Sequence, residues 1–485
     1  MHSSTSTPTP ASQPPLAAPS PATPRRSKRW AWFGGFALLL VAVPIAYYYI
    51  TAWLHDREMG EIYRALDEED PNWRWHDLAA EIKPPPDADN SALHIREIHV
   101  LLKATPFDTG PAWTDIKFRN ARLTDSQERI LRAAFAKVNP KAVPMARALK
   151  DKPRGTLAFE PVESPFLDIK LDYVQETRTL MNFLHYDALL RIHDNDPAGA
   201  IDSCRALVHA SRSLREQPFL ISLLVRYAGQ AMTIAAIEQT LAQNGEFTED
   251  MLRPLQEALE QEYADDGMHR AMRGERAGGQ QMYEQLRSGR TAISQLTTAM
   301  GAKAGFADHV IDFVPSVVLN SYPDHLKDMN EQVRASKLQD PERAAALREL
   351  EAQIRQRRTL LSMFLMPATF KVSEASQRTQ ANLRSCTTAL AVERHRLKHG
   401  QWPRDLNELV AAGLLKDVPK DPYDGKPLRL KKTPTGVIVY TLGPDKVDNG
   451  GALNRAAPLA PNTDYGFELW DPRFRGVPPP AGNDK

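Results

Sequence analysis

The feature that most constrains this chain is an uncharged apolar stretch near the N-terminus, 24 positions from Trp30 to Trp53. At about 1.5 Å per residue, a helix of this length covers roughly 36 Å and exceeds a hydrocarbon core of about 30 Å. Four cations directly precede it, Arg25, Arg26, Lys28 and Arg29. Because cations before a span tend to stay in the cytoplasm, the sequence predicts a transmembrane signal anchor over residues 30–53 with a cytoplasmic N-terminus. The rest of the chain is then expected on the periplasmic side of the cell's inner membrane.

A cleaved signal peptide is the alternative for this stretch. Such a peptide has an apolar core of about 7 to 15 residues and a cleavage site of small residues. The stretch is longer and ends in Tyr47, Tyr48, Tyr49 and Trp53, which are typical of the interface end of an uncleaved span. Pro44 is compatible with a transmembrane helix, since neighbouring groups can satisfy the freed carbonyl. The sequence therefore favours an uncleaved anchor.

The balance of charge in the composition limits the kinds of molecule that the protein is expected to bind. The chain has 61 basic and 60 acidic residues, so it has no global field to attract nucleic acid, and no nucleic-acid partner is expected. Residues 1–29 begin with a proline-rich run that lacks apolar periodicity and are predicted to be a disordered cytoplasmic tail. Cys204 and Cys386 are too few for a disulfide scaffold, and the sequence leaves open whether they are bridged.

Residues 54–368 carry patterns typical of helices, which predict a large helical extracytoplasmic domain. Helix starts are indicated at Asp70-Pro71, Asp196-Pro197 and Asp340-Pro341, since Asp caps first-turn amides and Pro fits the first helical position. Thr124 with Gln127 predicts a capping box. Turns at residues 195–197 and 244–245 predict antiparallel helical hairpins. A solenoid is the alternative, but the absence of a repeating consensus favours a non-repetitive bundle.

Residues 267–305 break this pattern, because they hold seven of the 25 glycines and are rich in arginine. Two interpretations stay open. The segment is a poorly packed helix with a solvated basic face, or it is a mobile loop that meets an anionic partner such as a lipid headgroup or a cell-envelope polymer.

Two histidine pairs are candidate metal ligands. His94 and His99 lie five positions apart, so on a helix their side chains are rotated by about 140° and leave different faces. His395 and His399 have the favourable spacing of four, but no acidic third ligand stands near them. The chain also lacks the sequence motifs of common hydrolases, kinases and nucleotide-binding enzymes. Enzymatic activity is thus neither supported nor excluded, and no catalytic residue is assigned.

The C-terminal part carries an ordered series of elements between residues 381 and 451. A helix ends at Gly400, a Trp402-Pro403 turn and a short leucine-rich helix follow, and two strand-like runs at 428–432 and 437–442 precede a polar loop. The series includes Arg396-Leu397, Leu406 to Leu409, Val418-Pro419, Asp421-Pro422, Gly425, and Leu442-Gly443 with Asp445. It resembles the C-terminal domain of the type II secretion system major pseudopilin. The resemblance implies a small α+β module, residues 369–476. A flexible tail is predicted at residues 477–485.

In that family the loop after the last strand binds calcium, so the resemblance implies calcium as a cofactor. Asp445, Asp448 and Asn449 are the expected ligands, since calcium prefers hard oxygen donors. The family loop usually has further acids, whereas residues 452–454 here are Ala, Leu and Asn. The alternative is a polar turn closed by hydrogen bonds from side chains to the backbone.

The resemblance does not extend to the N-terminus. A prepilin is cut between Gly and Phe and has Glu at the fifth mature position. Gly35-Phe36 matches the cleavage point, but Leu40 occupies the position of the glutamate.

The sequence thus predicts a mainly α fold, with an N-terminal transmembrane helix, a large bundle of helical hairpins and a small α+β pseudopilin-like C-terminal module. The leading hypothesis is a single-pass, membrane-anchored envelope protein that acts as a non-enzymatic scaffold or binding component with envelope protein partners. A membrane-tethered envelope hydrolase with a site between helices is the first alternative. An atypical pseudopilin of a type II secretion-like system is the second.

Overall fold

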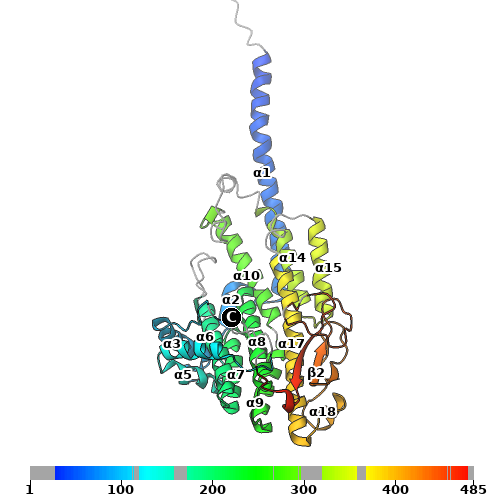
Figure 1. Ribbon diagram of the computed structural model, residues 1–485. Helices are drawn as coiled ribbons and strands as arrows, with labels where there is room; N and C mark the ends of the chain where they lie inside the picture. The colour runs from blue at the N-terminus through cyan, green and yellow to red at the C-terminus, as the bar shows by residue number, and fades with distance from the viewer. Residues whose placement is uncertain are drawn as a thin grey trace, which may run out of the picture. The chain divides into compact units, whose positions relative to one another are not determined.

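The computed structural model is mainly helical with one small antiparallel sheet, which confirms the predicted fold class at that level (Figure 1). The chain divides into two compact units between Glu61 and Ile62. The structure describes residues 28–111, 113, 119–157, 172–265, 267–292, 294–295, 319–357, 367–455, 457–458 and 460–478. The predicted N-terminal tail therefore lies outside the described residues up to residue 27.

Helix α1, Lys28–Glu69, contains the predicted span and ends just before Asp70, where the sequence indicates a boundary. In the smaller unit its large apolar side chains are exposed, and Leu38 is 71% exposed. Within the described ranges, two helices are long and apolar enough to cross a membrane: α1 and α8, Leu220–Leu241. Most of α8 is buried, as in the core helix of a soluble protein. The length and composition of α1 agree with a membrane span, and its orientation stays a prediction.

Short helices open the larger unit. They are α2 Trp75–Glu81, α3 Ser91–Ala104, α4 Asp125–Lys137 and α5 Ala142–Ala148, with 3₁₀ turns at Asp87–Asp89 and Leu149–Asp151. The predicted capping box at the start of α4 is confirmed. Thr124 Oγ1 accepts from the Gln127 amide at 3.2 Å, and Gln127 Oε1 accepts from the Thr124 amide at 3.0 Å. A helix start at Asp70-Pro71 was wrong, because α2 begins at Trp75 with Arg74 as its N-cap.

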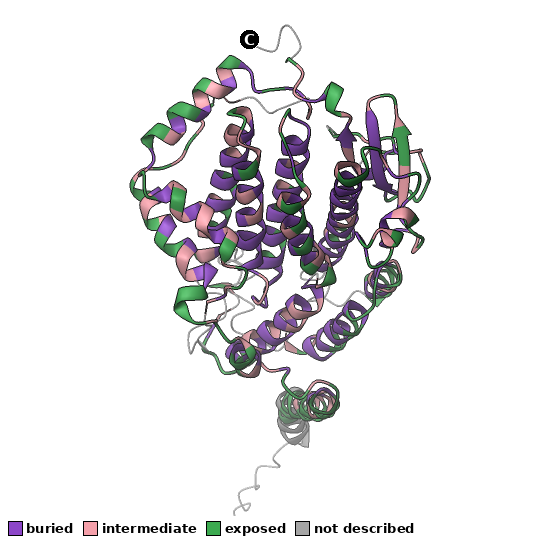
Figure 2. Cartoon of the chain, turned by 90° about the horizontal axis from the view of Figure 1, so that it is seen from below, coloured by how far each residue is buried: buried purple, intermediate pink, exposed green. Residues whose placement is uncertain are grey.

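Two pairs of helices form the middle of the larger unit, namely α6 Asp172–His193 with α7 Pro197–Arg212, and α8 with α9 Glu249–Ala264. The predicted N-caps of α7 and α9 are both present. Asp196 accepts from the Gly199 amide at 2.9 Å, and Thr248 accepts from the Met251 amide at 3.4 Å. Helix α6 packs along α7, so the first predicted hairpin is present, whereas α9 packs against α7 and α17 rather than along α8, so the second predicted hairpin is wrong. Figure 2 shows the buried residues gathered on the inner sides of the packed helices.

Helix α10, Met268–Arg287, begins the glycine-rich and arginine-rich segment. It is a helix, but the predicted solvated basic face is wrong here, because Arg276 is 1% exposed and Arg273 pairs with acidic residues. One glycine has a packing role: a Cβ on Gly274 would lie 1.7 Å from the carbonyl oxygen of Pro218. A mobile loop is equally wrong for residues 268–287. Most of residues 293–305 lies outside the described part of the chain.

Three further helices lead to the C-terminal sheet. They are α14 Tyr322–Ser336, α15 Glu342–Arg357 and α17 Pro367–His399. The start of α15 agrees with the signal at Asp340-Pro341, and α17 ends where predicted, with Gly400 at a φ of 75°. Gly at this position is favoured because the left-handed conformation there strains other residues.

The C-terminal elements are the short helix α18, Asn407–Ala411, and strands β1 Arg429–Thr433, β2 Gly436–Thr441 and β3 Tyr465–Trp470, followed by a 3₁₀ turn at Pro472–Phe474. The strands are antiparallel in the order β1-β2-β3, with Val439 opposite Leu430 on one side and Phe467 on the other. The first two strands match the predicted runs, and β3 was not predicted. Its outer edge is closed, since the Glu468 amide donates to Glu238 and the Gly466 carbonyl accepts from Arg455.

The sheet and helices α6 to α9 share one hydrophobic core. Val437, Val439, Phe467 and Leu469 from the sheet belong to the same buried cluster as side chains of α6 to α9 and α17. Figure 1 shows α17 beside both the sheet and helices α8 and α9. Cys204 and Cys386 are buried in this cluster as free thiols, so the structure contains no bridge between them.

Candidate functional site

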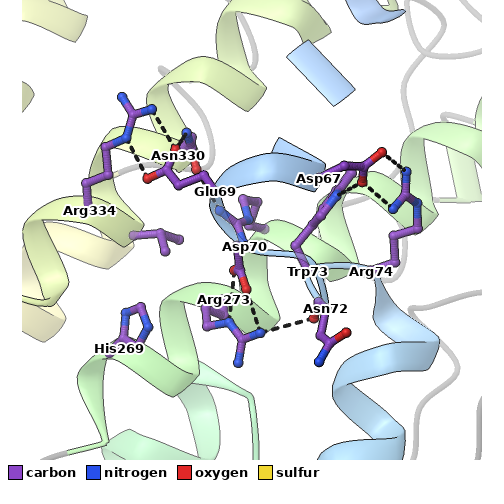
Figure 3. A network of polar contacts seen from close by, with 12 residues as sticks. Asp67, Glu69, Asp70, Asn72, Trp73, Arg74, His269, Arg273, Asn330 and Arg334 are labelled. Carbon is purple, nitrogen blue, oxygen red and sulfur yellow. Dashed lines mark hydrogen bonds and ion pairs between the residues drawn. The ribbon is translucent and has the colours of Figure 1, made fainter. Parts of the chain in front are cut away.

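A network of charged side chains surrounds the end of α1 inside the larger unit (Figure 3). We call it the α1 clamp, and it consists of Glu69, Asp70, Arg273, Arg276, Asn330 and Arg334. Two carboxylates come from the end of α1 and the residue after it, two arginines come from α10, and α14 supplies the other two residues. The clamp therefore joins three segments of the chain. Two of its residues, Asp70 and Arg273, are 203 positions apart in the sequence.

Asp70 lies between the two arginines of α10. Its carboxylate accepts from Arg273 Nη2 at 2.8 Å and Nε at 3.0 Å, and it also accepts from Arg276 Nη2. Arg273 reaches two further acceptors, Glu81 Oε2 and the Asn72 carbonyl. Burial works to raise the pKa of Asp70, but hydrogen bonds and charges from both arginines outweigh it, and its pKa lies below the usual value. Asp70 is therefore held as a carboxylate.

Glu69 pairs with residues of α14, whereas Asp70 pairs with residues of α10. Its carboxylate accepts from Arg334 Nη2 at 2.6 Å and Nε at 2.8 Å, and from Asn330 Nδ2 at 3.2 Å. Hydrogen bonding from Arg334 lowers the pKa of Glu69 to about 2. The two halves of the clamp are linked, because Arg276 Nη1 donates to Asn330 Oδ1 at 2.6 Å. The result is one continuous ion-pair network.

The clamp compensates an unfavourable feature of α1. The helix ends in an acidic run, Asp67 to Asp70, and has no basic residue in its last turn. Negative charge at a helix C-terminus opposes the helix dipole, so this end is destabilised unless cations are brought to it. Asp67 has partners nearby in the sequence, because its carboxylate accepts from Arg74 Nη1 at 2.5 Å and from the indole N–H of Trp73 at 2.9 Å. Glu69 and Asp70 depend on arginines from α10 and α14.

Sequence reasoning missed the clamp as a site. In the sequence, the arginines of α10 stand out only as part of a basic segment, and the pattern at Asp70 indicates a helix cap. A signal was nevertheless present, since an acidic run at the end of an apolar helix requires cationic partners.

The three residues expected to bind calcium lie in the loop between β2 and β3. Asp445 accepts from the amides of Val447 and Asn462, both at 3.1 Å. Asp448 Oδ1 accepts from the Gly450 amide at 2.9 Å and from the Tyr440 hydroxyl at 3.2 Å. The Asn449 side chain donates to the Val447 carbonyl at 3.1 Å. Each predicted ligand thus has hydrogen-bond partners within the loop or on the neighbouring strand.

This arrangement does not fit a calcium ion well. Calcium takes six to eight oxygen ligands, and oxygens that accept from N–H groups point toward those donors. In the described part of the chain, no group of three or more His, Cys, Asp or Glu side chains is placed to hold a metal ion. The observed hydrogen bonds are those of the polar-turn alternative. Calcium binding itself stays a prediction.

One histidine of each pair bonds to a backbone carbonyl. His94 Nε2 lies 2.9 Å from the Met145 carbonyl oxygen, and His395 Nδ1 lies 3.2 Å from that of Gln401. The rings of His395 and His399 lie 4.4 Å apart, which is a ring contact. These positions give no support to a metal centre at either pair.

Hollows in the described surface include two of several hundred Å³. A groove of about 760 Å³ between α14 and α15 is lined by charged side chains together with apolar ones that include Leu338 and Leu350. Arg334 of the α1 clamp forms part of its wall. The second, of about 410 Å³, lies beside α3 and includes His94, Glu97 and Lys152. Both mix charges of the two signs, and neither indicates one class of ligand.

Comparisons of this chain with protein-family models, with curated proteins and with solved structures found no match. The resemblance of residues 381–451 to the pseudopilin domain therefore stays a prediction. The structure adds the order of elements there: helix, short helix and a three-stranded antiparallel sheet.

Proposed function

We propose that this protein is a single-pass envelope protein of the inner membrane, in which α1 is the anchor and the larger unit is a scaffold or binding component on the periplasmic side. The observation that carries the proposal is the surface of α1. Large apolar residues between Phe36 and Leu54 are half or more exposed on every side of the helix. An apolar surface this extensive is rare on a soluble protein and suits a bilayer.

The scaffold role is supported by the way in which the larger unit holds the end of α1. The clamp fixes the last turn of α1 to α10 and α14 through paired charges, and α14 borders the groove described above. The last turn of α1 is thus an integral part of the larger unit, beside a groove, which supports a role in which the larger unit presents a binding surface.

The pseudopilin-like order of elements supports a second candidate, an atypical pseudopilin. The helix α17, the short α18 and the strands β1 and β2 occur in the order that the resemblance implies, and β3 is an additional strand. This candidate requires cleavage by a prepilin peptidase between Gly35 and Phe36. Mass spectrometry of the N-terminus separates the two candidates, because the scaffold keeps residues 1–35 and the pseudopilin loses them.

A topology experiment tests the main proposal. A reporter that is active only in the periplasm, fused after Lys485, is expected to be active. Replacing Arg25, Arg26, Lys28 and Arg29 with Gln should reduce that activity, because the cations before the span set its orientation. The matched control replaces Arg57 and Arg64, which follow the span, with Gln and should leave the activity unchanged or higher. An inactive wild-type fusion in a membrane fraction contradicts the proposed topology.

A further inference from the structure

Strand β1 carries two cations that reach the loop between β2 and β3. Arg429 and Lys431 lie two positions apart, so their side chains leave the same face of the strand. Lys431 Nζ donates to the carbonyl oxygen of Gly450. Arg429 reaches the same loop, where its Nε lies 3.4 Å from Asp448 Oδ2. The loop therefore has two positive charges supplied by its own sheet.

Arg429 is surrounded by three carboxylates. Besides Asp448 in the loop, it donates from Nη1 to Asp421 at 2.7 Å and from Nη2 to Asp424 at 2.6 Å. Asp421 is fully buried and also accepts from the amides of Tyr423 and Leu442, each at 2.8 Å. The three nitrogens of one guanidinium thus connect the segment before β1 with the loop after β2. A divalent cation could join the same carboxylates only by displacing this group.

Other carboxylate oxygens in and beside the loop accept from backbone amides. Asp464, at the start of β3, accepts from the amides of Asn449 at 3.4 Å and Gly451 at 2.7 Å. Both oxygens of Asp445 accept from amides, and so does Asp448 Oδ1. A second positive charge near Arg429 would also be repelled by the guanidinium group.

We propose that Arg429 and Lys431 are the resident cations of the loop between β2 and β3, and that the loop keeps its conformation without calcium. The side chain of Arg429 holds Asp448 against Asp421 and Asp424, and Lys431 fixes the carbonyl of Gly450. The calcium expected from the pseudopilin resemblance is then unnecessary in this chain. This inference is independent of the proposed function, since it concerns the loop alone.

Proteolysis of the full-length protein in detergent micelles tests the proposal. Lys446 is exposed in the loop, so an endoproteinase that cleaves after lysine and needs no calcium reports on loop opening there. The rate of cleavage at Lys446 is measured by mass spectrometry, and the melting temperature is measured beside it. With the wild-type protein, both should be the same in 2 mM calcium chloride and in 2 mM EGTA.

Two variants should open the loop. Arg429→Gln removes the central cation, and cleavage at Lys446 should rise by roughly fivefold or more, as expected for the loss of charged hydrogen bonds. Asp448→Asn removes only the partner of Arg429 in the loop, at a half-exposed position, and should raise the rate by a smaller factor. It keeps the proposal testable if Arg429→Gln does not fold. Calcium should not slow cleavage of Asp448→Asn.

Arg404→Gln is the matched control. It makes the same chemical change in the same part of the chain, but Arg404 is 86% exposed and pairs with Glu408 away from the loop. Its cleavage rate should equal that of the wild type. The proposal is overturned if calcium raises the wild-type melting temperature, if EGTA speeds wild-type cleavage, or if the Arg429 and Asp448 variants are cleaved no faster than Arg404→Gln.

Discussion

Helices α1 and α8 have the same mean hydropathy over their most apolar windows, yet that window is entirely unburied in α1 and 67% buried in α8. Helix α8 contains buried Arg226, Gln230 and Glu238, whereas residues 30–53 of α1 contain no charged side chain. Arg226, Gln230 and Glu238 each have a partner on another element. Arg226 Nη2 and Gln230 Nε2 donate to Glu262 of α9, at 2.9 and 2.8 Å.

The comparison teaches that apolar content alone does not separate a core helix from a membrane helix. A buried charge is tolerated where tertiary structure supplies a partner, and a lipid bilayer supplies none. The charges within an apolar run, and whether the rest of the chain can pair with them, are therefore more informative than its hydropathy. Three predictions test this difference.

The largest expected difference between the larger unit and the apolar part of α1 is their response to acid. His209 and His325 are buried in the larger unit, and desolvation lowers the pKa of each to about 4. Between their ordinary pKa of about 6.5 and pH 4, the unfolded chain binds protons that the folded chain does not. Stability should thus fall as the pH drops through this window, while the proposed span in α1, which has no group that titrates in this range of pH, should stay helical and inserted.

Thermal unfolding followed by circular dichroism between pH 7.5 and 4 measures this effect, with carbonate extraction of membranes to follow α1. His209→Gln should remove part of the pH dependence, because glutamine can keep the hydrogen bond to the Leu149 carbonyl, 2.9 Å away, without a titrating ring. A melting temperature that does not change across the window would contradict the prediction.

Contacts between residues close together in the sequence could be predicted, and contacts between residues far apart in the sequence could not. Thr124 with Gln127, and Asp196 with Gly199, lie within one helical turn, so their caps could be predicted from spacing. The partner of Asp70 is 203 positions away, and no local pattern identifies Arg273. Strand β3 was missed because a long irregular loop separates it from β2 and its pairing is set by the tertiary fold. The donors around Asp445 and Asp448 were equally unpredictable, because Asn462 and Arg429 come from outside the loop's acidic run.

One arginine placed in each helix should have a different effect. Leu40→Arg lies in the middle of the proposed span, where an arginine costs about 2.5–3.5 kcal/mol on insertion scales, so the membrane-inserted fraction should fall. Ile221→Arg lies on the exposed side of α8, where a surface substitution changes stability by about 0.5 kcal/mol or less. Carbonate extraction measures the first and urea unfolding the second. Equal insertion of Leu40→Arg and wild type would argue against a membrane span.

The smallest of the three effects concerns the α1 clamp. Asp70→Asn keeps the shape of the side chain but removes its charge, and should destabilise the larger unit by about 1–2 kcal/mol, as for a charged hydrogen bond that is mostly buried. Urea unfolding measures this. A double-mutant cycle with Arg273→Gln should give a coupling of at least about 0.5 kcal/mol.

Asp324→Asn serves as the control for this cycle, because Asp324 is a mainly exposed residue of α14 whose ion pair with Lys327 spans 3.8 Å. It should change stability by a few tenths of a kcal/mol at most. Additivity of Asp70→Asn and Arg273→Gln would show that the clamp does not act as a unit.

The core shared by the packed helices and the sheet has a consequence for the order in which the protein matures. Phe467 and Leu469 belong to the buried cluster that also contains side chains of α7, α8 and α9, although some 200 residues separate them along the chain. During synthesis, the helices emerge long before the strand that completes their packing. The central core can close only when β3 has left the ribosome. If the N-terminal span inserts first, the helices would cross the membrane before β3 completes their packing. A product truncated before residue 465 would stay incompletely folded and open to proteolysis.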